Sequence, residues 1–274
     1  MGIALLAAVM KKTSTLLAIG SALALSGTAH AEIEGEVHAG FNTDYVFRGA
    51  DLGGTNYEVG ADIGGSLSCG IDWSLGVWWI DAEESVVGNS GWEEIDFYGE
   101  LSKDVGFGTV AVGFVNYNYG DADFGLSGTG RDLPDDNEIY LSVATQFNDI
   151  SASLQLNYGF NGGFTFSESL ILEGGLGYDF DFTEDFSGSL SVDAGYVIDE
   201  GDTSSGSLSD DGFAFFSVSL SGSYAITEQI SFNPYITYAS GNDDVWTYFT
   251  NNPGDGPAYD FSGVYGGASL SVSF

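Results

Sequence analysis

Apolar residues recur at every second position along most of this chain. Between Ser189 and Tyr196, for instance, Leu190, Val192 and Ala194 alternate with serines and an aspartate. A spacing of two places successive side chains on opposite faces of a β-strand, whereas a helix would need a spacing near 3.6. The pattern therefore predicts an all-β protein in which each strand has one apolar and one polar face.

About twelve segments show this alternation. The predicted strands cover Gly35–Phe47, Tyr57–Ser68, Asp72–Trp79, Glu94–Leu101, Thr109–Tyr119, Ile139–Phe147, Ser151–Tyr158, Leu170–Phe180, Ser189–Tyr196, Phe216–Tyr224, Ile230–Ala239 and the residues that end at Phe274. Pro234 lies inside the eleventh segment and has no N–H for a strand ladder. We expect a bulge or a local irregularity there.

The links between these segments alternate in length. Links after even-numbered segments are short, such as Asn148–Asp149, whereas most links after odd-numbered segments are long, such as Gly120–Asp136. Short turns at one end and long loops at the other are typical of bacterial outer-membrane proteins. We therefore predict a transmembrane, antiparallel, up-and-down β-barrel of about twelve strands. A secreted β-sandwich is the alternative, but it would include strands that are apolar on both faces and turns of irregular length.

Residues 1–31 have the features of a secretory signal peptide. A basic pair, Lys11 and Lys12, precedes an apolar run, and the small residues of Thr28–Ala31 follow it as a cleavage site. We expect residues 32–274 to form the mature barrel in the bacterial outer membrane.

Aromatic residues gather near the ends of the predicted strands, where girdles at the membrane interfaces are expected. Those near the loops are Tyr45, Phe47, Trp79, Trp92, Tyr158 and Tyr196, and those near the turns are Phe147, Phe180, Tyr224 and Phe274. Phe274 also ends an alternating final segment, which resembles the signal that the outer-membrane assembly machinery reads. The predicted partners are therefore this machinery and the outer-membrane lipid.

The charge of the chain restricts its function. There are 5 Lys and Arg against 40 Asp and Glu, a formal net charge of −35, which excludes nucleic-acid binding through a basic patch. If the apolar faces meet lipid, acids line the lumen, attract cations and repel anions. The predicted pore-lining residues are Glu36, Asp44, Arg48, Glu58, Asp62, Asp72, Glu94, Asp96, Glu100, Glu138, Glu173, Asp179 and Asp193. We predict a porin-like channel for small solutes or ions that prefers cations.

Within this set, Arg48 is nearly alone in opposing the acids. We expect it to form an ion pair with Asp44 or to reach a facing carboxylate, and a substrate contact is the alternative. Either of two long loops, Gly120–Asp136 and Ser240–Ala258, is a candidate for folding inward as a constriction.

Two other functions are kept open. The barrel could be a non-conducting structural or adhesion protein that acts through its extracellular loops, with a lumen filled by side chains. It could instead be an outer-membrane hydrolase, if His38 lay beside a serine nucleophile such as Ser151 and an orienting acid. No nucleophile-elbow motif or regular metal-ligand spacing occurs, so neither catalysis nor a metal or cofactor is expected. Cys69 is predicted to lie unpaired in a turn.

One segment resembles a known family. The stretch Gly35–Gly49, which contains Thr43-Asp-Tyr-Val-Phe-Arg-Gly49, is similar to the opening Ser/Thr-Asp-Tyr-x-Phe-Arg-Gly segment of the TorF-type putative porin family. Tyr57–Gly65, Trp73–Trp79, Asp136–Tyr140 and Gly263–Gly267 resemble this family as well. The resemblance implies an outer-membrane channel.

Overall fold

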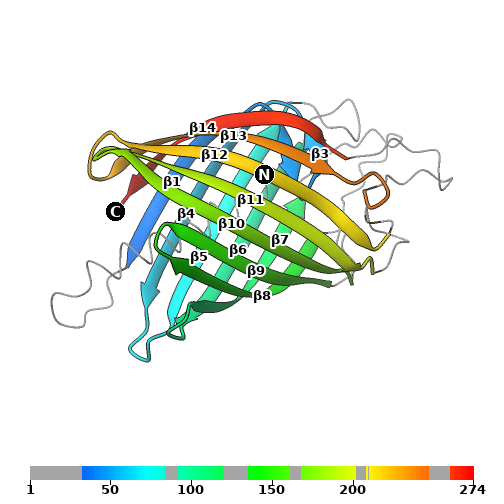
Figure 1. The fold of residues 1–274 in the computed structure, drawn as a ribbon, viewed down its shortest axis with the longest axis horizontal. Helices are drawn as coiled ribbons and strands as arrows, with labels where there is room; N and C mark the ends of the chain where they lie inside the picture. Colours follow the sequence, from blue (N-terminus) through cyan, green and yellow to red (C-terminus); the bar gives the residue numbers. More distant parts are fainter. Residues whose placement is uncertain are drawn as a thin grey trace.

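Twelve antiparallel strands form a closed barrel in the computed structural model (Figure 1). The structure describes residues 33–83, 92–119, 135–160, 168–201, 208, 210–246 and 260–274, so the predicted signal peptide lies outside it. The barrel strands are β1 (Glu34–Asn42), β4 (Asn56–Ser66), β5 (Asp72–Ala82), β6 (Trp92–Asp104), β7 (Thr109–Tyr119), β8 (Asp136–Phe147), β9 (Ile150–Phe160), β10 (Leu170–Thr183), β11 (Phe186–Asp199), β12 (Gly212–Ala225), β13 (Ile230–Gly241) and β14 (Ser262–Ser273). Among the described residues, no helix is long and apolar enough to cross a membrane.

Each strand pairs with its neighbours along the chain, and β1 closes the barrel against β14. Glu36 pairs with Ser273 in this last ladder, and Gly35 and Phe274 exchange two backbone hydrogen bonds of 2.9 Å. Closure leaves no free sheet edge, which is the condition for placing strands in lipid. The predicted barrel and its twelve strands are confirmed, and a two-sheet sandwich is excluded.

The alternation in the sequence becomes an alternation between the outside and the lumen. In β8, Ile139 and Leu141 are 47% and 57% exposed, whereas Glu138 and Tyr140, which alternate with them, are buried. The exposed positions form the outer apolar surface, and the buried ones point into the barrel. Tyr158, Tyr196, Phe147, Tyr224 and Phe274 lie exposed on the outer surface near the strand ends, as expected for girdles.

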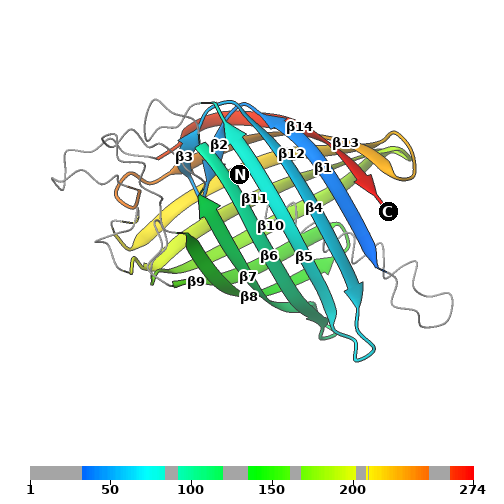
Figure 2. The same cartoon turned by 180° about the vertical axis from the view of Figure 1, so that it is seen from behind.

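The two ends of the barrel differ, and we name them by their connections. The turn end carries the short links 67–71, 105–108, 148–149, 184–185 and 226–229, together with the C-terminus. The loop end carries the longer links (Figures 1 and 2). Cys69 lies exposed in the first short turn as a free thiol, as predicted.

The predicted first strand is wrong in its second half. β1 ends at Asn42, and the chain then forms a separate two-stranded sheet of β2 (Tyr45–Phe47) and β3 (Ala50–Gly53) at the loop end (Figure 2). Tyr45 and Phe47 are 3% and 8% exposed, so they do not belong to the outer girdle. Their alternation continues that of β1, but the apolar side chains are buried against the lumen instead of facing lipid.

Pro234 produces a gap in a ladder and no bulge. It pairs with Ala268 of β14 in an unshifted register. On the other side, β12 and β13 pair at Ser221–Tyr235 and again at Tyr224–Phe232, and the two intervening positions are unpaired. The missing N–H of proline is thus accommodated by a short interruption of one ladder.

Candidate functional site

The candidate site is the lumen near the loop end, where residues 43–55 fold into the barrel. We call this segment, which contains β2 and β3, the inward hairpin. Phe47 pairs with Ala50, so Arg48 and Gly49 form a two-residue turn with φ angles of 50° and 82°. Positive φ at both positions is the geometry of a type I′ turn, for which Asn-Gly is the favoured sequence. An arginine at the first position costs about 1–2 kcal/mol of backbone strain, which points to a role for its side chain.

The backbone of the turn is held on one side of the lumen. Gly49 accepts a hydrogen bond of 2.7 Å from the N–H of Phe261. A β-carbon at Gly49 would lie 2.5 Å from Cβ of Phe215 and 2.8 Å from Cα of Gly241, so no side chain fits there. Ala50 adds an isolated bridge to Asp260. The tip of the hairpin therefore packs closely against the loop ends of β12 to β14.

The Arg48 side chain extends to the opposite side of the lumen, where it is buried. Its Nη1 and Nη2 donate to the two carboxylate oxygens of Glu138 at 2.7 and 3.0 Å, and its Nε donates to Oε1 of Glu173 at 2.7 Å. The Phe47 ring lies 4.9 Å from the guanidinium carbon. Burial opposes the charge of Arg48, but the two carboxylates outweigh it and hold the guanidinium pKa well above its ordinary value.

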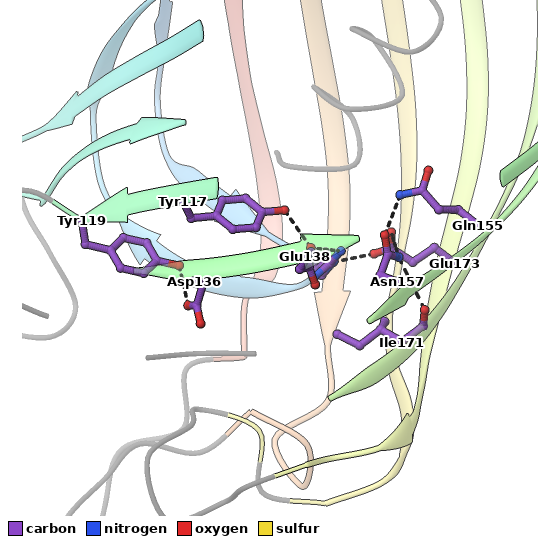
Figure 3. A network of polar contacts seen from close by, with 9 residues as sticks. Tyr117, Tyr119, Asp136, Glu138, Gln155, Asn157, Ile171 and Glu173 are labelled. Atoms are coloured by element: carbon purple, nitrogen blue, oxygen red, sulfur yellow. Dashed lines mark hydrogen bonds and ion pairs between the residues drawn. The ribbon is translucent and has the colours of Figure 1, made fainter. Parts of the chain in front are cut away.

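The two carboxylates are themselves fixed by the barrel wall (Figure 3). Tyr117 donates to Oε2 of Glu138 at 2.9 Å, and Asn157 donates to Oε2 of Glu173 at 2.9 Å. Gln155 in turn donates to Oδ1 of Asn157 at 2.7 Å. These partners lie on β7, β8, β9 and β10, so the site that receives Arg48 belongs to the wall and not to the hairpin.

Three further contacts attach the hairpin to this side of the lumen. The Tyr45 hydroxyl donates to Oε2 of Glu94 at 2.9 Å, and its ring lies 5.9 Å from that of Trp78. The Phe47 ring lies 5.7 Å from that of Tyr117. Aromatic pairs at such distances add to the area that they bury.

The predicted strand Gly35–Phe47 placed Asp44 on the barrel wall next to Arg48, and this is wrong. Both lie in the inward hairpin, because the chain leaves the barrel sheet after Asn42. The ion pairs of Arg48 reach facing carboxylates, which was one of the expected outcomes. Asp44 accepts a hydrogen bond of 2.7 Å from Thr43. Burial, together with the Asp44 carboxylate, raises the pKa of Asp51 from 3.8 to about 6.

Ten of the predicted pore-lining acids lie on barrel strands at buried or half-buried positions: Glu36, Glu58, Asp62, Asp72, Glu94, Asp96, Glu100, Asp179, Asp193 and Glu138. Glu173 is buried on β10. Among the described residues, Arg48 and Lys103 are the only Lys and Arg, and Lys103 is exposed. Sequence reasoning missed Asp136, which is buried and accepts from Tyr119 at 2.8 Å.

Tyrosines supply many of the hydrogen bonds to these acids. Tyr98 donates to Asp62 at 2.6 Å, and Tyr140 donates to Glu100 at 2.9 Å. Each of these rings crosses an intervening strand at a glycine, because a β-carbon at Gly76 or Gly113 would lie 2.2 Å from the tyrosine ring. A tyrosine hydroxyl is a neutral donor, so these contacts satisfy the carboxylates without cancelling their charge.

We call the inward faces of β4 to β8 the acidic wall. The inward faces of β11 to β14 are different, and we call them the hydroxyl wall. Its inward residues include Ser187, Ser189, Ser191, Ser217, Ser219, Ser221, Ser223, Ser231, Thr237, Ser269, Ser271 and Ser273. Asp193 is the one buried acid of these four strands. β10 to β13 are nearest the viewer in Figure 1 and β4 to β7 in Figure 2, so the two walls face each other.

Parts of other loops close over the same end. Val245 and Trp246 are buried, and Trp246 forms a bridge with Leu208 of the link between β11 and β12. They belong to the predicted constriction Ser240–Ala258, whose residues 247–258 lie outside the described part. Most of the other candidate, Gly120–Asp136, also lies outside it. The inward hairpin also folds into the lumen, and this was not predicted.

No group of three or more His, Cys, Asp or Glu residues suited to a metal ion occurs in the described part of the chain. His38 is buried on β1, where its ring occupies the space of a side chain at Gly60.

The closed barrel, the outward apolar surface and the short and long links define the fold of an outer-membrane β-barrel. The sequence matches the family described as "Bacterial protein of unknown function (Gcw_chp)" over residues 27–210, and the chain belongs to this family. No curated protein matches the chain.

Outer-membrane proteins are among the solved structures of similar fold. The COG4313 outer membrane channel from Pseudomonas putida F1 is 7% identical, with a TM-score of 0.50 over 90% of this chain and 97% of that one. The NanC porin is 10% identical, with a TM-score of 0.49 over 87% and 98% of the two chains. The KdgM porin is 12% identical, with a TM-score of 0.46 over 88% and 99%. At these identities the likeness concerns the fold alone.

Proposed function

We propose that the protein is an outer-membrane channel that passes small cations or cationic solutes and is narrowed by the inward hairpin. The observation that supports this proposal is the number of carboxylic acids at inward positions of the barrel strands. Acids occupy inward positions on β1, β4 to β6, β8, β10 and β11, and several are satisfied by neutral tyrosine hydroxyls. Rings of such carboxylates concentrate cations and repel anions.

The orientation follows from the ordinary rule for these barrels. Short turns face the periplasm and long loops face the outside, so the inward hairpin lies at the extracellular mouth. In this proposal residues 1–31 direct secretion, Phe274 is read by the outer-membrane assembly machinery, and the exposed apolar surface contacts outer-membrane lipid. The resemblance of residues 43–49 to the TorF-type putative porins supports the same function.

A second candidate function rests on a specific observation. The hairpin residues Tyr45, Val46 and Phe47 and the loop residues Leu208 and Trp246 are all buried at the mouth. A barrel closed in this way permanently would be a structural or binding protein that acts through its loops. A hydrolase is the least supported alternative, because it needs a serine nucleophile and an orienting acid beside His38.

Single-channel recording of the refolded mature protein in a planar bilayer, under a KCl gradient, tests the proposal. We expect discrete conductance steps and a reversal potential of the sign that K⁺ selectivity produces. An anion-selective reversal potential would contradict the cation preference. A silent barrel would favour the binding protein, and a hydrolytic activity lost in His38→Ala would favour the enzyme.

A further inference from the structure

The contacts of Arg48 define a binding site for a planar cation. A guanidinium presents its N–H groups in a fixed fork, and here two of them meet both oxygens of Glu138 while a third meets Glu173. An ammonium group is a compact charge and cannot repeat this arrangement of three donors in one plane. The site therefore distinguishes between cations by shape as well as by charge.

The acceptors of this site belong to the barrel wall. Tyr117 and Asn157 hold the two carboxylates from neighbouring strands, and none of these four residues lies in the inward hairpin. All four are buried at 4% exposure or less. Removal of the hairpin would leave a preformed pair of carboxylates facing the lumen.

The donor, by contrast, belongs to an element that is separate from the barrel sheet. β2 and β3 form their own two-stranded sheet, and their backbone contacts with the rest of the protein include an isolated bridge at Ala50 and the hydrogen bond to Gly49. The hairpin could therefore leave the lumen without breaking the ladder between any two barrel strands.

We propose that the Glu138–Glu173 pair is a guanidinium-binding site on the transport path, which Arg48 fills in the closed form and a solute carrying a guanidinium group fills as it passes. This inference rests on the proposed channel function and names its substrate class. Two buried carboxylates are costly without a counter-charge, so whatever replaces Arg48 is a cation. The fork of acceptors selects a guanidinium among cations.

The test uses the refolded mature protein, the variant Arg48→Ala, and methylguanidinium as a probe that matches the end of the arginine side chain. Methylammonium is the control, because it has the same charge without the fork. In bilayers we expect Arg48→Ala to conduct K⁺ more readily than the wild type. Methylguanidinium should then block it at a concentration at least about tenfold lower than methylammonium does, a difference that requires the bidentate contact.

Two triple variants separate the site from the total charge of the lumen. Arg48→Ala with Glu138→Gln and Glu173→Gln should lose the preference for methylguanidinium. Arg48→Ala with Glu36→Gln and Glu100→Gln removes the same charge elsewhere and should keep it. Equal block by the two cations in Arg48→Ala, or equal loss of preference in both triple variants, would overturn the inference.

A second measurement separates the site from the channel. Methylguanidinium should raise the thermal unfolding temperature of Arg48→Ala in detergent, and methylammonium should not. If Arg48→Ala binds the probe in this way but never conducts, the channel function fails while the site stands as a binding site. If it conducts without preferring the probe in either measurement, the site fails while the channel stands. Arg48→Gln, which keeps a polar side chain at the tip, serves in both measurements if Arg48→Ala does not fold.

Discussion

The acidic wall and the hydroxyl wall satisfy their polar groups in different ways. On the acidic wall, carboxylates accept from tyrosines of the adjacent strand or from tyrosines that cross one intervening strand, as in the pair Tyr140–Glu100. On the hydroxyl wall, short side chains bond their near neighbours, as Ser219 and Thr237 do at 2.7 Å. The first arrangement pairs carboxylates with neutral tyrosine donors, and the second pairs short neutral side chains with one another.

The inward hairpin uses both walls, each for a different contact. Its backbone packs at Gly49 against the loop ends of β12 to β14, where small and neutral groups allow close approach. Its charged side chain crosses to Glu138 on the acidic wall and to Glu173 beyond it. The comparison indicates that the neutral wall positions the hairpin and that the charged side of the lumen provides the electrostatic contact.

The largest expected effect on the free energy of unfolding comes from removing one carboxylate that binds Arg48. In Glu138→Ala, Arg48 keeps only Glu173 of its two described carboxylates, and the Tyr117 hydroxyl loses its hydrogen bond to Glu138. Breaking a buried pair costs about 3–5 kcal/mol. Thr237→Val is the matched change on the hydroxyl wall, where a lost hydrogen bond costs about 1 kcal/mol.

Urea unfolding of both variants in lipid vesicles measures this comparison. We expect the unfolding free energy to fall much further in Glu138→Ala than in Thr237→Val. Equal losses would mean that the Arg48 network contributes no more than an ordinary hydrogen bond, and that the two walls are equivalent in stability.

Removing a single tyrosine hydroxyl should lower the free energy of unfolding by a smaller amount. Tyr140→Phe keeps the ring over Gly113 and removes only the hydroxyl that donates to Glu100. Leaving this acceptor without its donor should cost about 1–2 kcal/mol. Ser221→Ala, whose hydroxyl makes a long contact of 3.5 Å to the Ser189 carbonyl, should cost less than about 0.5 kcal/mol. The same urea titration checks both, and a larger loss in Ser221→Ala would contradict the assignment of the walls.

The barrel itself could be predicted from the sequence because strand period and link lengths are local signals. The inward hairpin could not be predicted from these signals. Tyr45 and Phe47 continue the alternation of β1, and a period of two cannot tell a lipid-facing side chain from one that faces the lumen. One local signal was available, since Arg48-Gly49 is a pair that can form a two-residue turn between alternating residues.

The hydrogen-bond donors of the acids could not be predicted from the sequence either. The inward direction of Glu100 or Asp62 follows from strand parity, but the choice of Tyr140 and Tyr98 as donors depends on barrel register and on the glycines between them. Likewise, Arg48 and Glu173 are separated by 125 residues along the chain. Such contacts arise only when closure brings distant strands together.

The smallest expected effect is a pH dependence of how firmly the inward hairpin is held in the lumen, which we call its seating. The pKa of Asp51 is raised to about 6, first by burial and then by Asp44, so the folded hairpin favours the protonated carboxyl. A raised pKa contributes stability that is fully present below the ordinary value of 3.8 and is lost as the pH rises through about 6. The hairpin should therefore be seated most firmly near pH 4 and less firmly at pH 7. The open probability of single channels should rise modestly over this range, because the half-exposed position of Asp51 weakens the effect.

Asp51→Asn is the matched variant for this prediction, because it has the shape of the protonated side chain and does not titrate near neutral pH. Its open probability should stay at the low value across the same range, while the wild type changes. Asp243→Asn, at an exposed loop position near the same mouth, is the control and should follow the wild type. A wild type whose open probability falls as the pH rises would contradict the predicted direction. A pH profile of Asp51→Asn that matches the wild type would assign the effect to another group. Either result would mean that the protonation of Asp51 does not control how firmly the hairpin is held in the lumen.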